Sequence, residues 1–130
     1  MTLEYIWNRI LTELEDRKNM PQIDHTDMPT AFKILTDAGI GISMKSVLPS
    51  QLKHSQSKVN NKKVQSIVKD LKSGKKLPPI VIANDYLIVD GHHRQVAYDN
   101  LNPSEEIWVV MIDLSWDKAI MVYKKVEDIL

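Results

Sequence analysis

The stretch that decides the fold is the run Ile88-Val89-Asp90-Gly91-His92-His93-Arg94. Its first residues are apolar and β-branched, which predicts a buried strand, and Gly91 then opens a predicted helix that continues to about Leu101. A strand that enters a helix directly at a glycine points backbone N–H groups and the positive end of the helix dipole at one spot. Such a spot attracts anions, so the run predicts a phosphate-binding turn.

The polar side chains of this turn suit phosphate chemistry. Gly91 lets a phosphate approach the backbone, and Arg94 can donate two parallel hydrogen bonds from one helical turn further on. His92 and His93 supply donors, or a general base when neutral. Asp90 can hold a divalent metal ion, orient a histidine or accept a proton from an attacking hydroxyl. The candidate catalytic residues are therefore Asp90, His92, His93 and Arg94, with Asp90 as the candidate ligand of Mg²⁺ or Mn²⁺.

A purely structural role for the same residues is the alternative. Asp90 would then cap the helix, Gly91 would serve the turn, and Arg94 would pair with an acid, with both histidines exposed. A metal ion bound by the two histidines is disfavoured, because adjacent rings diverge at a helix start and no third ligand is close in the sequence. Spacing alone does not choose between the two interpretations.

Periodicity outward from this turn predicts the remaining elements. Helices are expected over residues 2–18, 28–38, 61–73 and 91–101, and a last helix is opened by Ser115 or Asp117 and continues through Val126. A first strand is expected around Ile40, Ile42 and Met44 and is closed by Pro49, and further strands are expected over 80–82, 86–89 and 107–112. Asn60 suits the cap of the third helix, while Gly39 and Gly74 suit left-handed helix ends. The pattern predicts an α+β fold, a small mixed sheet flanked by helices, in a domain of residues 40–130. Residues 1–39 are expected to form an N-terminal helical extension with an amphipathic first helix.

Composition limits the classes of function. A chain of 130 residues suits one domain, and the absence of cysteine excludes disulfides, zinc–thiolate sites and thiol chemistry. No apolar stretch is long enough to cross a bilayer and no secretory signal is visible, so we expect a cytoplasmic protein. Trp7 lies on the predicted first helix, which is a candidate homodimer contact. Trp108, Trp116 and Tyr123 are expected in the core or at a partner interface, and His54 is expected to be an idle surface histidine.

Charge is zero overall but unevenly placed. Between Lys53 and Lys76 the chain carries eight lysines against the single acid Asp70. A cationic helix of this kind attracts polyanions, and it is equally typical of a solvated surface. The candidate nucleic-acid-binding residues are Lys58, Lys62, Lys63 and Lys69.

Four motifs in this order resemble the ParB/sulfiredoxin superfamily, in particular the small stand-alone ParB-like nuclease domain proteins of bacteriophages. They are Ser46-Val47-Leu48-Pro49, Ser55-Gln56-Ser57-Lys58, Pro79-Ile80-Val81-Ile82, and the run from Ile88 to Arg94 with Ala97. The resemblance covers about Ile42 to Leu101. It implies that Gly91, His92, His93 and Arg94 hold the phosphates of a nucleotide such as ATP or CTP. Gln56 and Lys58 would add a second phosphate contact, weaker by one arginine than the Gln-Pro-Arg segment of ParB.

The same turn separates the branches of the superfamily. Sulfiredoxins need a cysteine where His92 stands, so reduction of sulfinic acids is excluded. Free serine kinases carry a similar Asp-Gly-His turn but use an upstream glutamate, and none lies between Glu15 and Glu105. The expected function is a phosphoryl hydrolase, either a nuclease or a nucleotidase, working in the host cytoplasm if phage-encoded. The alternatives are a non-catalytic nucleotide- or DNA-binding regulator and a small-molecule kinase.

Overall fold

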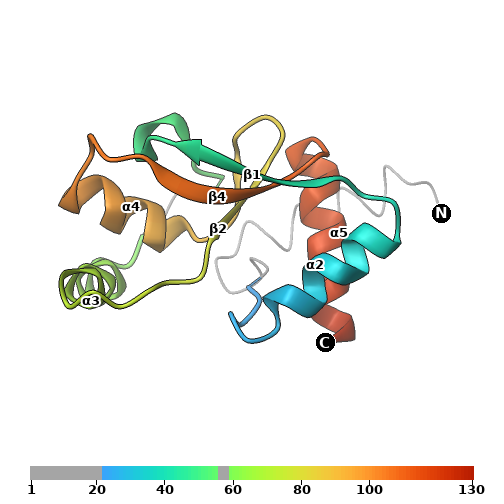
Figure 1. Cartoon of the computed structure of the whole chain (residues 1–130), viewed down its shortest axis with the longest axis horizontal. Helices are drawn as coiled ribbons and strands as arrows, with labels where there is room; N and C mark the ends of the chain where they lie inside the picture. The colour runs from blue at the N-terminus through green and yellow to red at the C-terminus, as the bar shows by residue number, and fades with distance from the viewer. Residues whose placement is uncertain (1–21, 56–58) are drawn as a thin grey trace.

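The computed structural model describes residues 22–55 and 59–130, which form helices on both sides of one sheet (Figure 1). In chain order the elements are α2 (Met28–Asp37), β1 (Ile42–Val47), the short 3-10 helix η2 (Pro49–Gln51), α3 (Asn61–Lys72), β2 (Ile80–Ala83), β3 (Ile88–Asp90), α4 (His92–Leu101), β4 (Ile107–Ile112) and α5 (Trp116–Ile129). The predicted α+β class is thus confirmed. The helix expected over residues 2–18, with its dimer contact at Trp7, lies outside the described residues.

The sheet is mixed, with strand order β1-β4-β2-β3. β4 pairs antiparallel with the edge strand β1 and parallel with β2, while β2 and β3 form an antiparallel hairpin. Because β2 and β4 run in the same direction, the chain must cross over between them, and α4 provides this crossover. The carboxyl end of β3 is therefore where α4 begins, and this junction carries the polar turn.

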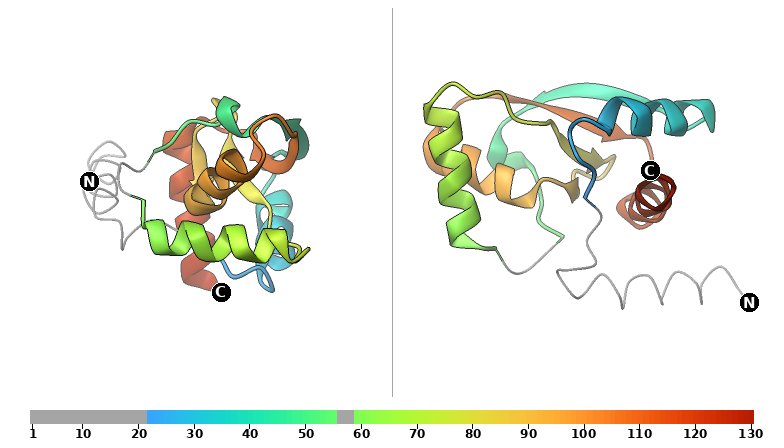
Figure 2. Two further views of the ribbon diagram at one scale, coloured as in Figure 1. Left: turned by 90° about the vertical axis from the view of Figure 1, so that its left-hand side faces the viewer. Right: turned by 90° about the horizontal axis from the view of Figure 1, so that it is seen from below.

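Two buried clusters lie on opposite faces of the sheet. Successive residues of β2 alternate between them, since Ile80 and Ile82 join one cluster while Val81 and Ala83 join the other. The cluster with Val81 also contains residues of α2 and α5, including Leu35 and the fully buried Tyr123. Figure 2 shows α3 on the outer side of α4, against which it packs. The boundary at residue 39 between extension and domain remains a prediction, although α2 shares its core with α5.

Most predicted elements are found within two residues of their expected positions, and two details differ. β1 begins at Ile42 rather than Ile40, where its pairing with β4 starts, and it ends at Val47, before Pro49 as expected. The hairpin turn is longer than expected: Tyr86 has a positive φ of 68°, and the return strand begins at Ile88. Trp108 is 65% exposed opposite Ser46 of the edge strand, which excludes the core, and its alternative place at a partner interface stays a prediction.

Candidate functional site

The turn between β3 and α4 needs a glycine for two reasons. Gly91 has a φ of +107°, a left-handed conformation that side-chain-bearing residues rarely adopt. A Cβ at this position would also lie 3.0 Å from Nη2 of Arg94 and 3.1 Å from Cγ1 of Ile80. Among the described residues, no side chain makes a capping hydrogen bond at the N-cap Gly91 of α4.

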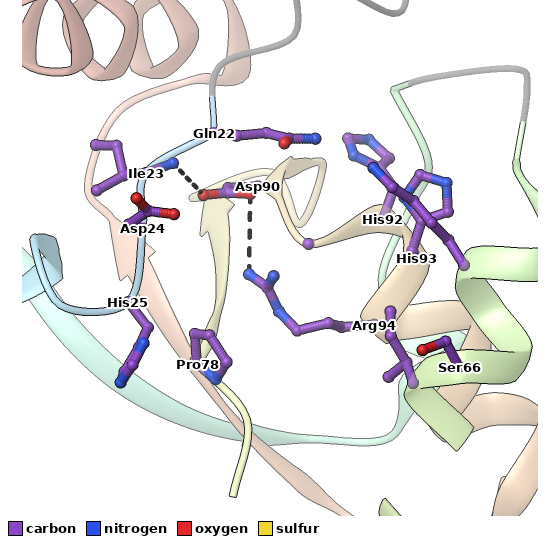
Figure 3. Close-up of a pocket in the computed structure, with 13 residues that line it drawn as sticks. Gln22, Ile23, Asp24, His25, Ser66, Pro78, Asp90, His92, His93 and Arg94 are labelled. Atoms are coloured by element: carbon purple, nitrogen blue, oxygen red, sulfur yellow. Dashed lines mark hydrogen bonds and ion pairs between the residues drawn. The ribbon is translucent and has the colours of Figure 1, made fainter. Parts of the chain in front are cut away.

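A cavity of about 410 Å³ opens at this turn (Figure 3). One wall is the segment before α2, with Asp24 and His25, and the opposite wall is α3, with Lys63 and Ser66. The turn itself, from Asp90 to Arg94, also lines the cavity. The walls come from segments far apart in the sequence, so the tertiary fold creates the cavity.

Arg94 lies at the mouth of this cavity and is only partly engaged. Its Nη2 donates to the carbonyl oxygen of Pro79 at 3.2 Å and lies 3.8 Å from Oδ1 of Asp90. Its Nε is buried and has no hydrogen-bond partner among the described residues. A buried N–H without a partner is costly, which makes Arg94 receptive to an anionic ligand.

Asp90 is 4% exposed and is held by protein donors. Its Oδ2 accepts hydrogen bonds from the hydroxyl of Tyr123 at 2.7 Å and from the backbone N–H of Ile23 at 3.2 Å. Burial raises the pKa of Asp90 above its usual value, although the charge of Arg94 and these hydrogen bonds oppose the rise. Burial and the nearby carboxylate likewise raise the pKa of Tyr123. Asp90 therefore ties β3 to α5 and to the segment before α2.

The contacts of Asp90 bear on its predicted role as a metal ligand. Its carboxylate already faces three protein partners, and no group of three His, Cys, Asp or Glu side chains suited to a metal ion occurs in residues 22–55 and 59–130. Metal binding at Asp90 stays a prediction, and the geometry favours a positioning role.

His92 and His93 are buried rather than exposed, at 4% and 8% exposure. Nε2 of His92 lies 3.3 Å from the backbone nitrogen of Ser55 and 2.9 Å from its Oγ, which also donates to the carbonyl oxygen of Ile88 at 2.7 Å. Nε2 of His93 accepts from the backbone N–H of Asn60 at 3.2 Å. Both rings thus face the chain on either side of residues 56–58.

His54 is exposed but not idle. Its Nε2 lies 2.6 Å from Oε1 of Gln95, whose amide nitrogen donates to the carbonyl oxygen of Pro49 at 2.8 Å. The rings of His54 and His92 are 5.6 Å apart. His54 therefore helps attach the chain after η2 to the first turns of α4.

The structure brings most of the predicted site residues together. Asp90, Gly91, His92, His93, Arg94 and Lys63 all line the cavity. Lys62 is exposed on α3 away from the cavity lining, and Lys69 lines a separate surface hollow with Lys72. Gln56 and Lys58 lie outside the described residues.

Sequence reasoning missed the wall formed by residues 22–25 and the buried partner Tyr123. Asp24 and His25 precede a helix by a few residues and resemble ordinary capping residues, so nothing local places them at a site. Tyr123 repeats at helical spacing among apolar residues, which predicts only burial. Both reach Asp90 or its cavity through tertiary contacts alone.

The mixed sheet and its flanking helices also occur in known structures. Two solved structures of a pNOB8-like ParB N-domain share this fold. One matches with a TM-score of 0.54 and 19% identity over 69% of this chain, and the C2221 form matches with 0.53 and 17% over 69%. The match spans 35% and 38% of those chains.

These comparisons confirm the predicted ParB-like fold. No family model matches the sequence, and no curated protein is significantly similar to it. The phage-type and nuclease assignments therefore stay predictions. No helix in the described part of the chain is long and apolar enough to cross a membrane.

Proposed function

We propose that this domain binds the phosphate groups of a nucleotide in the cavity at the N-terminus of α4. The observation that carries the proposal is the buried Nε of Arg94, which lacks an acceptor among the described residues at the edge of a cavity of about 410 Å³. Lys63 on the α3 wall supplies a second positive charge, and the N-terminus of α4 supplies the positive end of its helix dipole. A phosphate group would interact favourably with all three.

Binding is better supported than hydrolysis. A hydrolase needs a base that reaches the nucleophile, but the Asp90 carboxylate accepts from Tyr123 and Ile23, and Nε2 of each histidine faces backbone nitrogen. These contacts suit groups that hold the turn in shape. We therefore propose a nucleotide-binding module, with phosphoryl hydrolysis by the same turn as the second candidate.

A DNA contact by α3 is proposed as an additional property. Lys62, Lys69 and Lys72 are exposed on this helix, which packs against α4, and none of the three lines the nucleotide cavity. Asp70 lies 3.8 Å from the ammonium of Lys75, and within residues 22–55 and 59–130 no ion pair involves Lys62, Lys69 or Lys72.

Binding is tested by titrating ATP, CTP and inorganic triphosphate, each with and without Mg²⁺, against the protein in a calorimeter. We expect at least one of them to bind, and we expect Arg94→Ala to weaken binding about tenfold or more through the loss of a charge-assisted hydrogen bond. Lys33→Ala is the matched control, because this exposed lysine pairs with Asp37 on α2 and lies outside the cavity. Equal affinities for the wild type and Arg94→Ala would refute the proposed site.

Turnover is tested separately by measuring phosphate release and plasmid nicking with Mg²⁺ or Mn²⁺. Activity that disappears in Arg94→Ala would make the hydrolase the first candidate instead of the second. Nucleotide-dependent thermal stabilisation without product would support the binding module.

A further inference from the structure

Both histidines of the turn place Nε2 next to a backbone nitrogen elsewhere in the chain. Nε2 of His92 is 3.3 Å from the backbone nitrogen of Ser55, and Nε2 of His93 is 3.2 Å from that of Asn60. A backbone N–H can only donate, so Nε2 of His93 is an unprotonated acceptor. Nε2 of His92 also lies 2.9 Å from Oγ of Ser55, whose one proton goes to the carbonyl oxygen of Ile88, so whether it donates or accepts depends on the tautomer. In both cases the protein's own chain engages the imidazole.

The contact of His93 continues directly into α3. Asn60 is the N-cap of this helix, and its Oδ1 accepts from the backbone N–H groups of Lys62 at 2.9 Å and Lys63 at 3.2 Å. One hydrogen-bonded path therefore runs from the His93 ring through Asn60 to the first turn of α3. Lys63 is in that first turn and lines the cavity.

The contact of His92 leads to the sheet. Ser55 bonds the His92 ring and also donates its hydroxyl to the carbonyl oxygen of Ile88 in β3, two residues before Asp90. The His92 ring thus helps to hold Ser55 against β3, the strand that leads into the turn. Because both histidines are nearly fully buried, these contacts are shielded from water.

We propose that His92 and His93 are positioning residues that hold the α3 wall, and with it Lys63, against the phosphate-binding turn. This inference rests on the proposed nucleotide binding and assigns the histidines a different task within it. The sequence-based expectation made them phosphate ligands or general bases. In the proposal His93 acts on the ligand through Asn60 and Lys63, and His92 acts through Ser55.

Side-chain length at residue 93 provides a test that separates a positioning role from direct binding of the phosphate. Glutamine places Oε1 near the position of Nε2 and can accept the Asn60 N–H, whereas asparagine is too short to do so. Neither side chain can carry the positive charge of an imidazolium. His93→Gln and His93→Asn are therefore a matched pair that differs in whether the contact to Asn60 can form.

The first measurement is amide hydrogen exchange of Asn60, Lys62 and Lys63 in the full chain without ligand. Protection of these amides should persist in His93→Gln and should fall about tenfold in His93→Asn, as one hydrogen bond is removed. The same comparison at residue 92 reports on the amide of Ser55. Unchanged protection in the asparagine variants would overturn the proposal.

The second measurement is the affinity for ATP of the same variants. We expect His93→Gln to bind within about threefold of the wild type and His93→Asn to bind about tenfold more weakly. Asn60→Ala should resemble His93→Asn, because it breaks the next link of the path. Equal weakening by glutamine and asparagine would show that the histidine itself binds the phosphate and would overturn the positioning role.

The two measurements also separate this inference from the proposed function. Should the wild type bind no nucleotide or triphosphate, the proposed function fails, while amide exchange still decides whether the histidines hold α3. His93→Gln retains the hydrogen bond, so at least one variant of the pair is expected to remain folded.

Discussion

Two groups would compete for the guanidinium of Arg94: the carboxylate of Asp90 and an anion bound in the cavity. At 3.8 Å from Oδ1 of Asp90, its Nη2 forms a loose ion pair, and its Nε has no described partner. An incoming phosphate offers the shorter, bidentate geometry that a guanidinium prefers. Ligand binding at this turn would therefore replace a weak internal pair with a stronger external one.

The buried carboxylate of Asp90 makes the stability of the domain depend on pH. Its pKa in the folded state is raised above the usual 3.8 by burial, so the folded state holds this proton more tightly than the unfolded chain. Its contribution to the free energy of unfolding is therefore largest below about pH 3.8 and falls as pH rises through the raised pKa. Asp90→Asn removes this titration and keeps an oxygen acceptor for Tyr123 and Ile23.

The check is urea denaturation of both proteins at several pH values upward from about pH 3.5, which lies below the usual pKa of Asp90. As pH rises from there, we expect the wild type to lose stability relative to Asp90→Asn. The other acids titrate in both proteins and cancel in the difference. A stability difference that is independent of pH, or that favours the wild type at higher pH, contradicts the raised pKa.

Gly91 is predicted to be irreplaceable for both backbone and contact reasons. Gly91→Ala should lower the free energy of unfolding by about 1–3 kcal/mol from the positive φ alone, and the crowded Arg94 should shift and weaken ATP binding. Gly39→Ala is the control, since Gly39 has a φ of +83° but nothing within 4 Å of the added Cβ. Calorimetry should show weakened ATP binding for Gly91→Ala only; weaker binding by both variants would point to a general backbone effect.

At the residue scale, the sequence predicted which side chains meet but not how they are used. Gly91 and Arg94 could be assigned from the sequence, because a glycine between a strand and a helix, followed by an arginine one turn later, is typical of an anion-binding turn. The use of the histidines could not be predicted, because their partners are backbone N–H groups some thirty to forty residues away. Periodicity contains no information about such contacts.

Among the elements, α3 contributes to both proposed binding sites with different sides of the helix. Its buried side packs against α4, its first turn brings Lys63 to the cavity, and its outer side carries the remaining lysines. Asn60 fixes where the helix begins. Nucleotide and DNA binding would thus use different faces of one helix and can be separated by substitution.

Replacement of Lys62, Lys69 and Lys72 by glutamine should weaken binding to duplex DNA and flatten its dependence on salt. Removal of each phosphate interaction should reduce the slope of log K against log salt by about 0.9. Fluorescence anisotropy with labelled DNA at several salt concentrations measures the slope. The matched control replaces three exposed lysines elsewhere, Lys33, Lys118 and Lys125, with the same change of net charge. An equal effect of both triple variants would assign the binding to overall charge rather than to α3.

Helices and central strands were predictable because their signals are local. Asn60 accepts from Lys62 and Lys63 as a capping residue should, and Gly39 and Gly74 both have a φ of +83°. The edge strand was placed less well, since its limits follow from pairing with β4 and not from its own alternation. The exposure of Trp108 could not be predicted for the same reason: strand position in the sheet, not residue type, decides it.

For the whole molecule, the strand order was beyond the reach of sequence patterns. The placement of β4 between β1 and β2, and of residues 22–25 beside the turn, depends on which surfaces meet after the elements form. Asp90 lies where these long-range contacts converge, since it bonds Tyr123 of α5 and Ile23 of the early segment. Asp90 therefore joins the turn that lines the cavity to both ends of the described chain.

This convergence predicts that the two buried clusters unfold together. Because β2 contributes alternate residues to both clusters, disruption of either one should remove the support of the other. Ile82→Ala in one cluster and Ile120→Ala in the other should each lower the free energy of unfolding by about 2–5 kcal/mol. Circular dichroism and tryptophan fluorescence should give one coincident urea transition for each variant. Met44→Ala, at an exposed position of β1, should change stability by no more than about 0.5 kcal/mol. Two separate transitions in either core variant would mean that α2 and α5 form a unit independent of the turn, and Asp90 would then not couple them.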